Sequence, residues 1–209
     1  KILTGPIGQE LSDKLVESSG VRILHPFWYY GTRQITSNKP IETAEDLKDT
    51  KIRVPLVPIQ QEGLSAMGGR ATPVDFGELY MALETGVVDA QENPLSIILT
   101  NNYDKVQDYL IISDHIVAEV MLSVNEKKFQ TLTQEQQDIV MEAAEEAAQL
   151  NNKLMMESEQ SAVSDLEERG MTVIRPDKDS FKEAVKDLHE KYDEKYNGLV
   201  TRITEESGK

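Results

Sequence analysis

Carboxylate and amide side chains gather in the segment VVDAQENP, residues 87–94. Groups of this kind accept and donate the hydrogen bonds that polar ligands need. Asn93 and Pro94 at its end suit the N-cap and the first residue of a helix. The segment is therefore predicted to be a strand that runs into a helix N-terminus, an edge where anionic or polar ligands can bind.

A second candidate is Arg53, which alternates with Ile52 and Val54 in the apolar segment KIRVP. A buried charge costs free energy unless a partner neutralises it, so Arg53 needs an anion. Two partners stay open. One is a structural carboxylate, such as Asp75 or Glu78. The other is a ligand carboxylate, which a guanidinium binds through two parallel hydrogen bonds.

Arg33 follows the aromatic segment FWYYGT, whose rings could wall a pocket. His25, His115 and His189 are far apart and lack the spacing of metal ligands, so no metal site is predicted. Ser113 and the other serines lack the context of a nucleophile. No placed acid–base pair is evident, and nothing in these residues demands catalysis.

The composition limits the possible partners. The chain has 209 residues, 39% of them hydrophobic, with a net charge of −15 and no cysteine. The excess of acids argues against nucleic acid and against anionic membrane surfaces. The lack of cysteine excludes disulfides and zinc–thiolate sites. The chain begins without a methionine or a signal-peptide pattern, so we expect a processed or truncated front.

The elements that must position these residues alternate along the middle of the chain. Strands are expected at 51–55, 70–75, 87–92 and 110–115, and helices at 59–69, 76–86 and 94–109. This alternation predicts a parallel α/β sheet with the ligand beyond the carboxyl ends of its strands. Asp75 and Glu78 form a predicted capping box for the second helix.

The outer segments are less regular. We expect a helix at 5–20, a strand at 21–31 that ends in an aromatic loop, and a short strand at 35–38. Thr43 and Asp46 suit the start of a short helix. Near the C-terminus, 179–198 is expected to be one helix.

A long helix is predicted from Gln134 to Arg169, which contains no glycine or proline. At 1.5 Å per residue it would measure about 50 Å, more than the roughly 30 Å of a small domain, so it could brace two lobes. An alternative is two helices with a bend near Ser158. Apolar residues in this segment repeat at the helical spacing 4-4-3-4: Ile139, Ala143, Ala147, Leu150 and Leu154.

Three segments together carry a resemblance: TRQITSNKPIETAEDLKDTKIRVP, GGRATPVDFGELYMALETGVVDAQENPLS and YDKVQDYL. They closely resemble the solute-binding proteins of TRAP transporters, the DctP-like family, over essentially the whole chain. The resemblance implies a two-lobed, periplasmic-binding-protein-like α/β fold. It also implies a protein without a cofactor or enzymatic activity that closes on a small organic acid and delivers it to a TRAP membrane permease.

Candidate ligand contacts follow by resemblance. Arg53 matches the family arginine that pairs with the ligand carboxylate, and Arg33 matches a second arginine near it. Phe76 matches the residue that packs on the ligand. Asn93 matches an asparagine that hydrogen-bonds the ligand acid while it caps the helix. Asp89 and Glu92 are expected to be structural partners of the backbone or of arginines.

The aromatic segment adds Trp28 and Tyr30 as candidate contacts. Many sugar-acid binders of the family carry an aromatic–Trp–Asp–Asn–Gly loop where this chain has FWYYG. Leu56 stands where some sialic-acid binders place asparagine. The preferred ligand is a sugar acid such as a uronate or aldonate, and a C4-dicarboxylate comes second.

The family architecture also predicts the domains. Residues 31–118 and 156–209 are expected to form lobe two, and 1–30 and 119–155 a remnant of lobe one whose N-terminal part is missing. The expected protein is monomeric at full length and periplasmic, or membrane-tethered outside a Gram-positive cell. Two alternatives stay open: a ligand-sensing module of a receptor, and an enzyme on a periplasmic-binding-like fold.

Overall fold

The structure is a computed structural model that describes residues 2–208. These residues form two compact units. Unit 1 comprises 2–30, 118–157 and 196–208, and unit 2 comprises Gly31–Val117 and Ser158–Lys195. The C-terminal residues differ from the expected domains, because 196–208 belong to unit 1 rather than with 156–195. The interpretation of the two units as the two family lobes stays a prediction.

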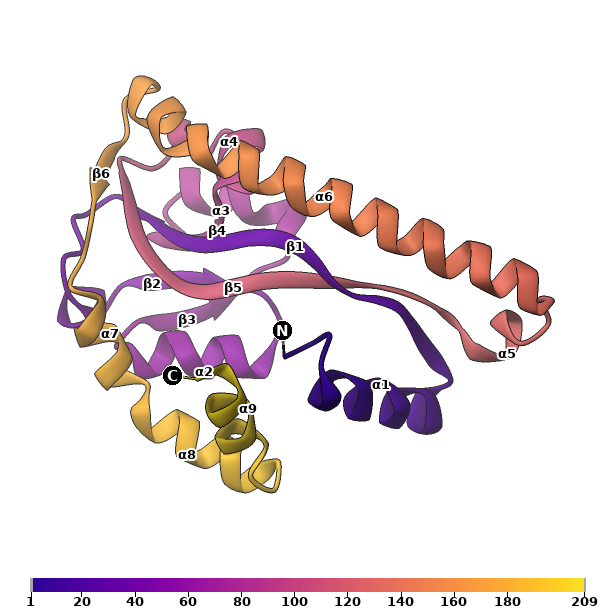
Figure 1. The fold of residues 1–209 in the computed structure, drawn as a ribbon. Helices are drawn as coiled ribbons and strands as arrows, with labels where there is room; N and C mark the ends of the chain where they lie inside the picture. Colours follow the sequence, from indigo (N-terminus) through magenta and orange to yellow (C-terminus); the bar gives the residue numbers. More distant parts are fainter. Residues whose placement is uncertain (1, 209) are drawn as a thin grey trace. The chain divides into compact units, whose positions relative to one another are not determined.

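Unit 2 is built on a sheet with the strand order β3-β2-β4-β1-β5-β6 (Figure 1). Its strands are β1 (Val21–Ser37), β2 (Lys51–Val54), β3 (Arg70–Pro73), β4 (Ala90–Pro94), β5 (Tyr109–Asn125) and β6 (Thr172–Ile174). Strand β2 runs parallel to β3 and β4, whereas β1 runs antiparallel to β4. The sheet is therefore mixed, and the prediction of a purely parallel sheet is wrong.

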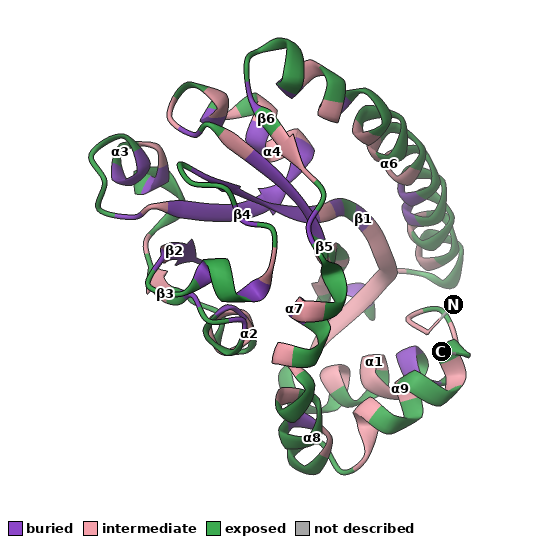
Figure 2. Ribbon diagram, turned by 90° about the vertical axis from the view of Figure 1, so that its left-hand side faces the viewer, coloured by how far each residue is buried: buried purple, intermediate pink, exposed green. Residues whose placement is uncertain are grey.

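Helices cover both faces of the unit 2 sheet (Figures 1 and 2). The core on one face takes side chains from α3 (Leu79–Glu84), α4 (Leu95–Thr100) and the C-terminal part of α6 (Gln134–Glu168). The core on the other face takes them from η1 (Ala44–Leu47), α2 (Pro58–Ala66) and α7 (Lys178–Ala184). Successive residues of β5 point into opposite cores, which leaves the strands as the most buried layer.

Two strands are longer than predicted. Strand β1 joins the expected strands at 21–31 and 35–38, and β5 joins the expected strand at 110–115 to a longer strand that the sequence predicts over 116–129. Each contains one residue with a positive φ, Gly31 at 121° and Asp114 at 47°. These two residues distort the strands locally without ending them.

The caps of two helices were predicted wrongly. Asn93 lies in β4 and Pro94 is the N-cap, so Asn93 does not cap the following helix. That helix, α4, ends at Thr100, and η3 (Tyr103–Lys105) follows after the left-handed Asn102. At η2 (Phe76–Glu78), the side chain of the N-cap residue Asp75 makes no cap hydrogen bond, so the predicted capping box is absent there.

Unit 1 contains α1 (Pro6–Ser19), the outer halves of β1 and β5, α5 (Glu126–Phe129), most of α6, and α9 (Leu199–Ser207). Helix α6 is fastened to β1 through two side-chain amides. Asn152 Oδ1 accepts a hydrogen bond from the Tyr29 N–H at 2.7 Å, and Asn151 Nδ2 donates to the Tyr29 carbonyl at 3.0 Å. Side chains of α6 thus satisfy backbone groups of β1.

Helix α6 is continuous over its 35 residues, which confirms the single long helix. Thr133 and Gln136 cap its start with reciprocal hydrogen bonds. Three of the apolar residues at helical spacing, Ile139, Leu150 and Leu154, are 58%, 58% and 53% exposed. The helix instead buries three alanines, Ala144, Ala148 and Ala162, together with Leu166. Small side chains let the helix lie close to its neighbours, a preference that the apolar spacing concealed.

The predicted C-terminal helix is two helices, α7 and α8 (Lys186–Lys195), which meet at Val185. Phe181 and Tyr192 are buried as expected. None of the helices within residues 2–208 combines the length and apolar character needed to cross a membrane.

Candidate ligand-binding site

Arg53 lies in β2 between two fully buried core residues, Ile52 and Val54, and is itself only 4% exposed. Since strand residues alternate, Arg53 points to the face opposite Ile52 and Val54. Its Nε donates to the Val74 carbonyl at 2.9 Å, and its Cζ lies 5.9 Å from the centre of the Phe76 ring. Burial lowers the pKa of Arg53 from its ordinary value.

No carboxylate within ion-pair distance of Arg53 is found among residues 2–208. The two structural partners that the sequence left open, Asp75 and Glu78, form no ion pair with it in this part of the chain. Because Nε is engaged by Val74, the terminal nitrogens Nη1 and Nη2 are the groups that can donate to a ligand. A planar carboxylate with two oxygens matches this pair of donors.

Arg33 has a different environment. Its Nε and Nη2 donate to the Glu92 carboxylate, Nη2 at 2.7 Å from Oε1, and Nη2 also contacts the Glu92 carbonyl at 2.7 Å. The Glu92 side chain is completely buried. Burial raises the pKa of Glu92, but hydrogen bonds from His115 and Arg33 outweigh this and leave the pKa below its ordinary 4.5. The positive charge of Arg33 is therefore neutralised within unit 2.

A buried chain of side chains supports Glu92. His115 Nε2 lies 3.3 Å from Glu92 Oε2, and His115 Nδ1 lies 2.8 Å from Ser113 Oγ. Asp114 between them has a left-handed φ of 47°. The order Ser–His–Glu resembles a hydrolase triad. Ser113 is only 4% exposed, however, so its hydroxyl serves the buried network rather than a substrate.

Sequence reasoning missed Ser113 and His115 as neighbours of the site. A separation of two residues places them on one face of a strand. Their contact with Glu92, however, depends on the pairing of β5, β1 and β4, which no local pattern records.

Asn93 is 4% exposed and belongs to a buried amide network. Its Nδ2 donates to Gln91 Oε1 at 2.6 Å, and Gln91 in turn donates to Thr36 Oγ1 at 2.9 Å. Its Oδ1 accepts from Arg33 Nη2 at 3.3 Å. Asn93 is thus held between a neutral network and Arg33, and its contact with a ligand stays a prediction.

Pairing of the strands brings four predicted residues to one edge of the sheet. Arg33 pairs with Pro94, next to Asn93, and Arg53 pairs with Gln91. Phe76 follows β3 and stacks near Arg53. The prediction that Asp89 and Glu92 are structural partners of the backbone or of arginines is confirmed. Asp89 Oδ2 accepts from the Lys51 N–H at 2.9 Å, and Glu92 binds Arg33.

Trp28 and Tyr30 belong to unit 1. The Trp28 Nε1 is buried without a hydrogen-bond partner among the described residues, and Tyr30 is 37% exposed. Their contact with a ligand stays a prediction.

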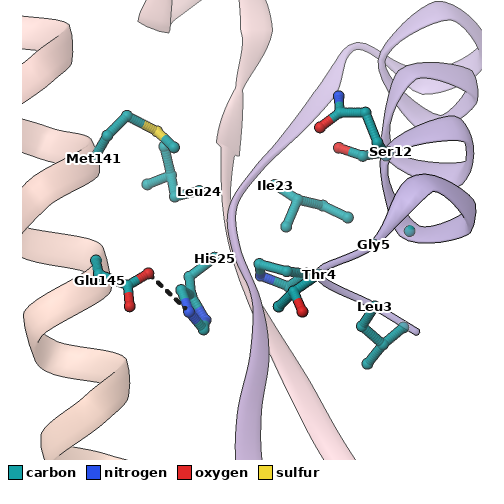
Figure 3. Close-up of a pocket in the computed structure, with 12 residues that line it drawn as sticks. Leu3, Thr4, Gly5, Ser12, Ile23, Leu24, His25, Met141 and Glu145 are labelled. Carbon is teal, nitrogen blue, oxygen red and sulfur yellow. Dashed lines mark ion pairs between the residues drawn. The ribbon is translucent and has the colours of Figure 1, made fainter. Parts of the chain in front are cut away.

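Unit 1 contains a separate hollow of about 260 Å³ (Figure 3). The His25 imidazole projects toward Glu145, with Nε2 3.2 Å from the carboxylate, and its Nδ1 accepts from the Phe27 N–H. Among the described residues, neither lysine nor arginine lines this hollow. An exposed carboxylate with no described lysine or arginine beside it disfavours an organic anion, so the edge with Arg53 is the better candidate for one.

The chain is similar to known proteins over most of its length. Residues 1–195 match the model of the DctP family, bacterial extracellular solute-binding protein family 7. A solute-binding protein of Roseobacter denitrificans is 35% identical over 90% of this chain and 57% of its own length. The sialic acid-binding periplasmic protein SiaP of Vibrio cholerae is 33% identical over 92% of this chain and 60% of its own.

Solved structures have the same fold. The Roseobacter protein, a TRAP periplasmic solute-binding protein with bound L-galactonate, superposes with a TM-score of 0.82 over 90% of this chain and 62% of that chain. A TRAP protein from Ochrobacterium anthropi with bound L-fuconate is 33% identical, with a TM-score of 0.90 over 98% and 68%.

The chain spans less than two thirds of the length of both curated relatives. Its α/β fold is that of the two-lobed TRAP solute-binding proteins. The match of family, sequence and fold covers the strands that carry Arg33, Arg53 and Asn93. The chain therefore belongs to family 7 of the bacterial extracellular solute-binding proteins.

Proposed function

We propose that this chain binds a small organic acid as the solute-binding component of a TRAP transporter and delivers it to the membrane permease. The ligand carboxylate binds Arg53 through Nη1 and Nη2, with Phe76 packed beside it and Asn93 and Arg33 at the same edge. The protein acts outside the cytoplasm, in the periplasm or tethered to a membrane, as a monomer and without catalysis or nucleic acid.

The observation that carries this proposal is the environment of Arg53. The guanidinium is 4% exposed and forms no ion pair with residues 2–208. A buried charge without a counter-ion is costly, and a ligand carboxylate would remove that cost. The engaged Nε and the neighbouring ring fix the direction from which a carboxylate can approach.

The charges at the edge favour a sugar acid with one carboxylate over a C4-dicarboxylate. Arg33 is paired with Glu92, whereas Arg53 is attracted by Glu92 and Asp75 but is in ion-pair contact with no carboxylate among the described residues. The second carboxylate of a dicarboxylate ligand would lose hydration on binding, and no further cation among the described residues of this edge would compensate for that loss. Both solved relatives hold monocarboxylates, L-galactonate and L-fuconate, which supports this order.

A binding screen tests the proposal. A ligand at 100 times its dissociation constant stabilises the native state by about 2.7 kcal/mol, which raises the melting temperature. We expect stabilisation by aldonates and uronates, and none by their amides or by neutral sugars. Stabilisation by neutral sugars alone would contradict the role of the carboxylate.

Arg53→Ala then tests the contact itself. Loss of one partner of a buried charge pair costs about 2–5 kcal/mol, which weakens binding roughly 30-fold to several thousand-fold. Arg53→Lys should recover only part of this loss because lysine cannot form the planar fork. Arg70→Ala, which removes an exposed arginine from the neighbouring strand β3, is the matched control. Calorimetric titration of the folded variants gives the affinity of each, and an unchanged affinity of Arg53→Ala would refute the proposal.

A further inference from the structure

Gly31 occupies an unusual position within β1. It is buried in the middle of a 17-residue strand, and its φ of 121° lies in a region that L-amino acids rarely adopt. A Cβ atom at this position would lie 2.7 Å from Pro94 Cβ and 3.0 Å from Glu159 Oε1. Both the backbone angle and the available space therefore require glycine here.

The neighbours of Gly31 come from two other elements. Pro94 ends β4 and pairs with Arg33, two residues beyond Gly31 on the same face of β1. Glu159 lies in α6, and its Oε1 accepts a hydrogen bond from the Thr32 N–H at 2.7 Å. The missing side chain of Gly31 thus leaves room for the Pro94 ring and allows the Glu159 carboxylate to reach the adjacent backbone of β1.

We infer that Gly31 and Glu159 are positioning residues for the ligand-binding edge. Gly31 leaves the space that the Pro94 ring occupies, and Glu159 fixes the β1 backbone beside it. Together they set the position of Arg33 and of the segment that carries Asn93. This inference rests on the proposed function, because it assigns the two residues to the binding of the same ligand.

A side chain at position 31 forces one of the neighbouring groups to move. Ordinary contact begins near 3.4 Å, so Pro94 Cβ and a new Cβ must move apart from 2.7 Å. The proline ring is closed on its own backbone and cannot rotate away. The displacement therefore passes to the β4 backbone, which carries Glu92 and Asn93, the two residues that bind Arg33.

The effect on binding follows from that displacement. Sites of this kind require their groups within about 0.5 Å of the productive geometry. A misplacement of about 1 Å can cost about 100-fold in function. We expect Gly31→Ala to weaken binding of a sugar acid about 10- to 100-fold in the protein that remains folded.

Two other glycines separate the causes. Gly20 has a φ of 68° but nothing within 4 Å of its Cβ position, so Gly20→Ala introduces left-handed strain without crowding. Gly63 lies in α2 with nothing within 4 Å and no positive φ, so Gly63→Ala introduces neither. We expect both variants to bind as the wild type does, although Gly20→Ala loses stability.

Glu159 provides an independent arm should Gly31→Ala fail to fold. Glu159→Gln keeps an oxygen that can accept from the Thr32 N–H, whereas Glu159→Ala removes it. We expect weaker binding for Glu159→Ala and near-normal binding for Glu159→Gln. Glu157→Ala, which removes an exposed acid from the same helix, is the control for lost charge.

The experiment combines titration with a readout that needs no ligand. Each variant is titrated with whichever of L-galactonate, L-fuconate and D-glucuronate stabilises the wild type most. In parallel, the Arg33 Nε–H resonance in a nitrogen-15 NMR spectrum reports the hydrogen bond between Arg33 and Glu92. The resonance is assigned by its absence from the spectrum of Arg33→Lys. We expect this resonance to shift and to exchange faster in Gly31→Ala and Glu159→Ala, and to stay unchanged in Gly20→Ala and Gly63→Ala.

The outcomes are distinguishable. If the wild type binds and Gly31→Ala and Glu159→Ala bind equally well, the inference is overturned and the proposed function stands. If no acid of the panel binds the wild type, the proposed function fails, and the Arg33 resonance still decides whether Gly31 and Glu159 position Arg33. An unchanged Arg33 resonance in both variants would overturn that role.

Discussion

Arg33 and Arg53 lie at the same edge of the unit 2 sheet, yet their surroundings differ. Arg33 is bound to Glu92, a fully buried carboxylate that His115 also contacts. Arg53 has a backbone carbonyl and an aromatic ring as neighbours, and no carboxylate in ion-pair contact among residues 2–208. The first arginine is part of the scaffold, and the second is available to an external anion. Burial alone does not distinguish a binding arginine from a structural one; the location of its counter-ion does.

The comparison predicts opposite effects of the same substitution on stability. Arg33→Met leaves Glu92 buried without its cation and should lower the free energy of unfolding by about 3–5 kcal/mol. Arg53→Met removes an uncompensated buried charge and should leave that free energy equal or higher. Urea unfolding without ligand measures both. Equal destabilisation by the two variants would show that Arg53 also has a structural counter-ion.

The pH dependence of stability should follow Glu92. The folded-state pKa of Glu92 is lowered, so its contribution to stability is fully present above its unfolded pKa, near 4.5. The contribution is lost as the pH falls from there through the folded pKa. Glu92→Gln should therefore flatten the loss of stability in this acidic range. Denaturant midpoints between pH 3 and pH 6 test this, and parallel curves for the two proteins would contradict it.

Phe76 should contribute less than either charge. Its ring is 48% exposed and lies near the Arg53 guanidinium. Exposed contacts of this kind contribute about 0.5–1 kcal/mol. Phe76→Ala should lower stability by about that amount and also weaken acid binding, since it frees the orientation of Arg53. Phe76→Leu should restore packing without restoring the cation–π contact.

Asp75→Asn should have the smallest effect. Asp75 attracts Arg53 electrostatically but forms no ion pair with it among the described residues. Substitutions away from such contacts usually change stability by no more than about 0.5 kcal/mol. A loss above about 2 kcal/mol would identify Asp75 as the hidden counter-ion and remove the difference between the two arginines.

The sequence determined most of the elements and the family. Helix α6, the caps at Thr43 and Thr133, and the strand that carries Arg53 follow from local signals: apolar spacing, capping residues, and the lack of glycine and proline. These signals act within about one helical turn, so they survive any tertiary arrangement.

The tertiary structure decided which charges cancel. Glu92 and Arg33 are 59 residues apart, and only the antiparallel pairing of β1 with β4 brings them together. It likewise decided that Asn93 lies in a strand instead of capping a helix. It also decided that Ala144, Ala148, Ala162 and Leu166 of α6 are buried while Ile139, Leu150 and Leu154 are exposed. The physical reason is the same in each case. Pairing and close packing depend on distant segments, and no local pattern of residues records which distant partner a side chain will meet.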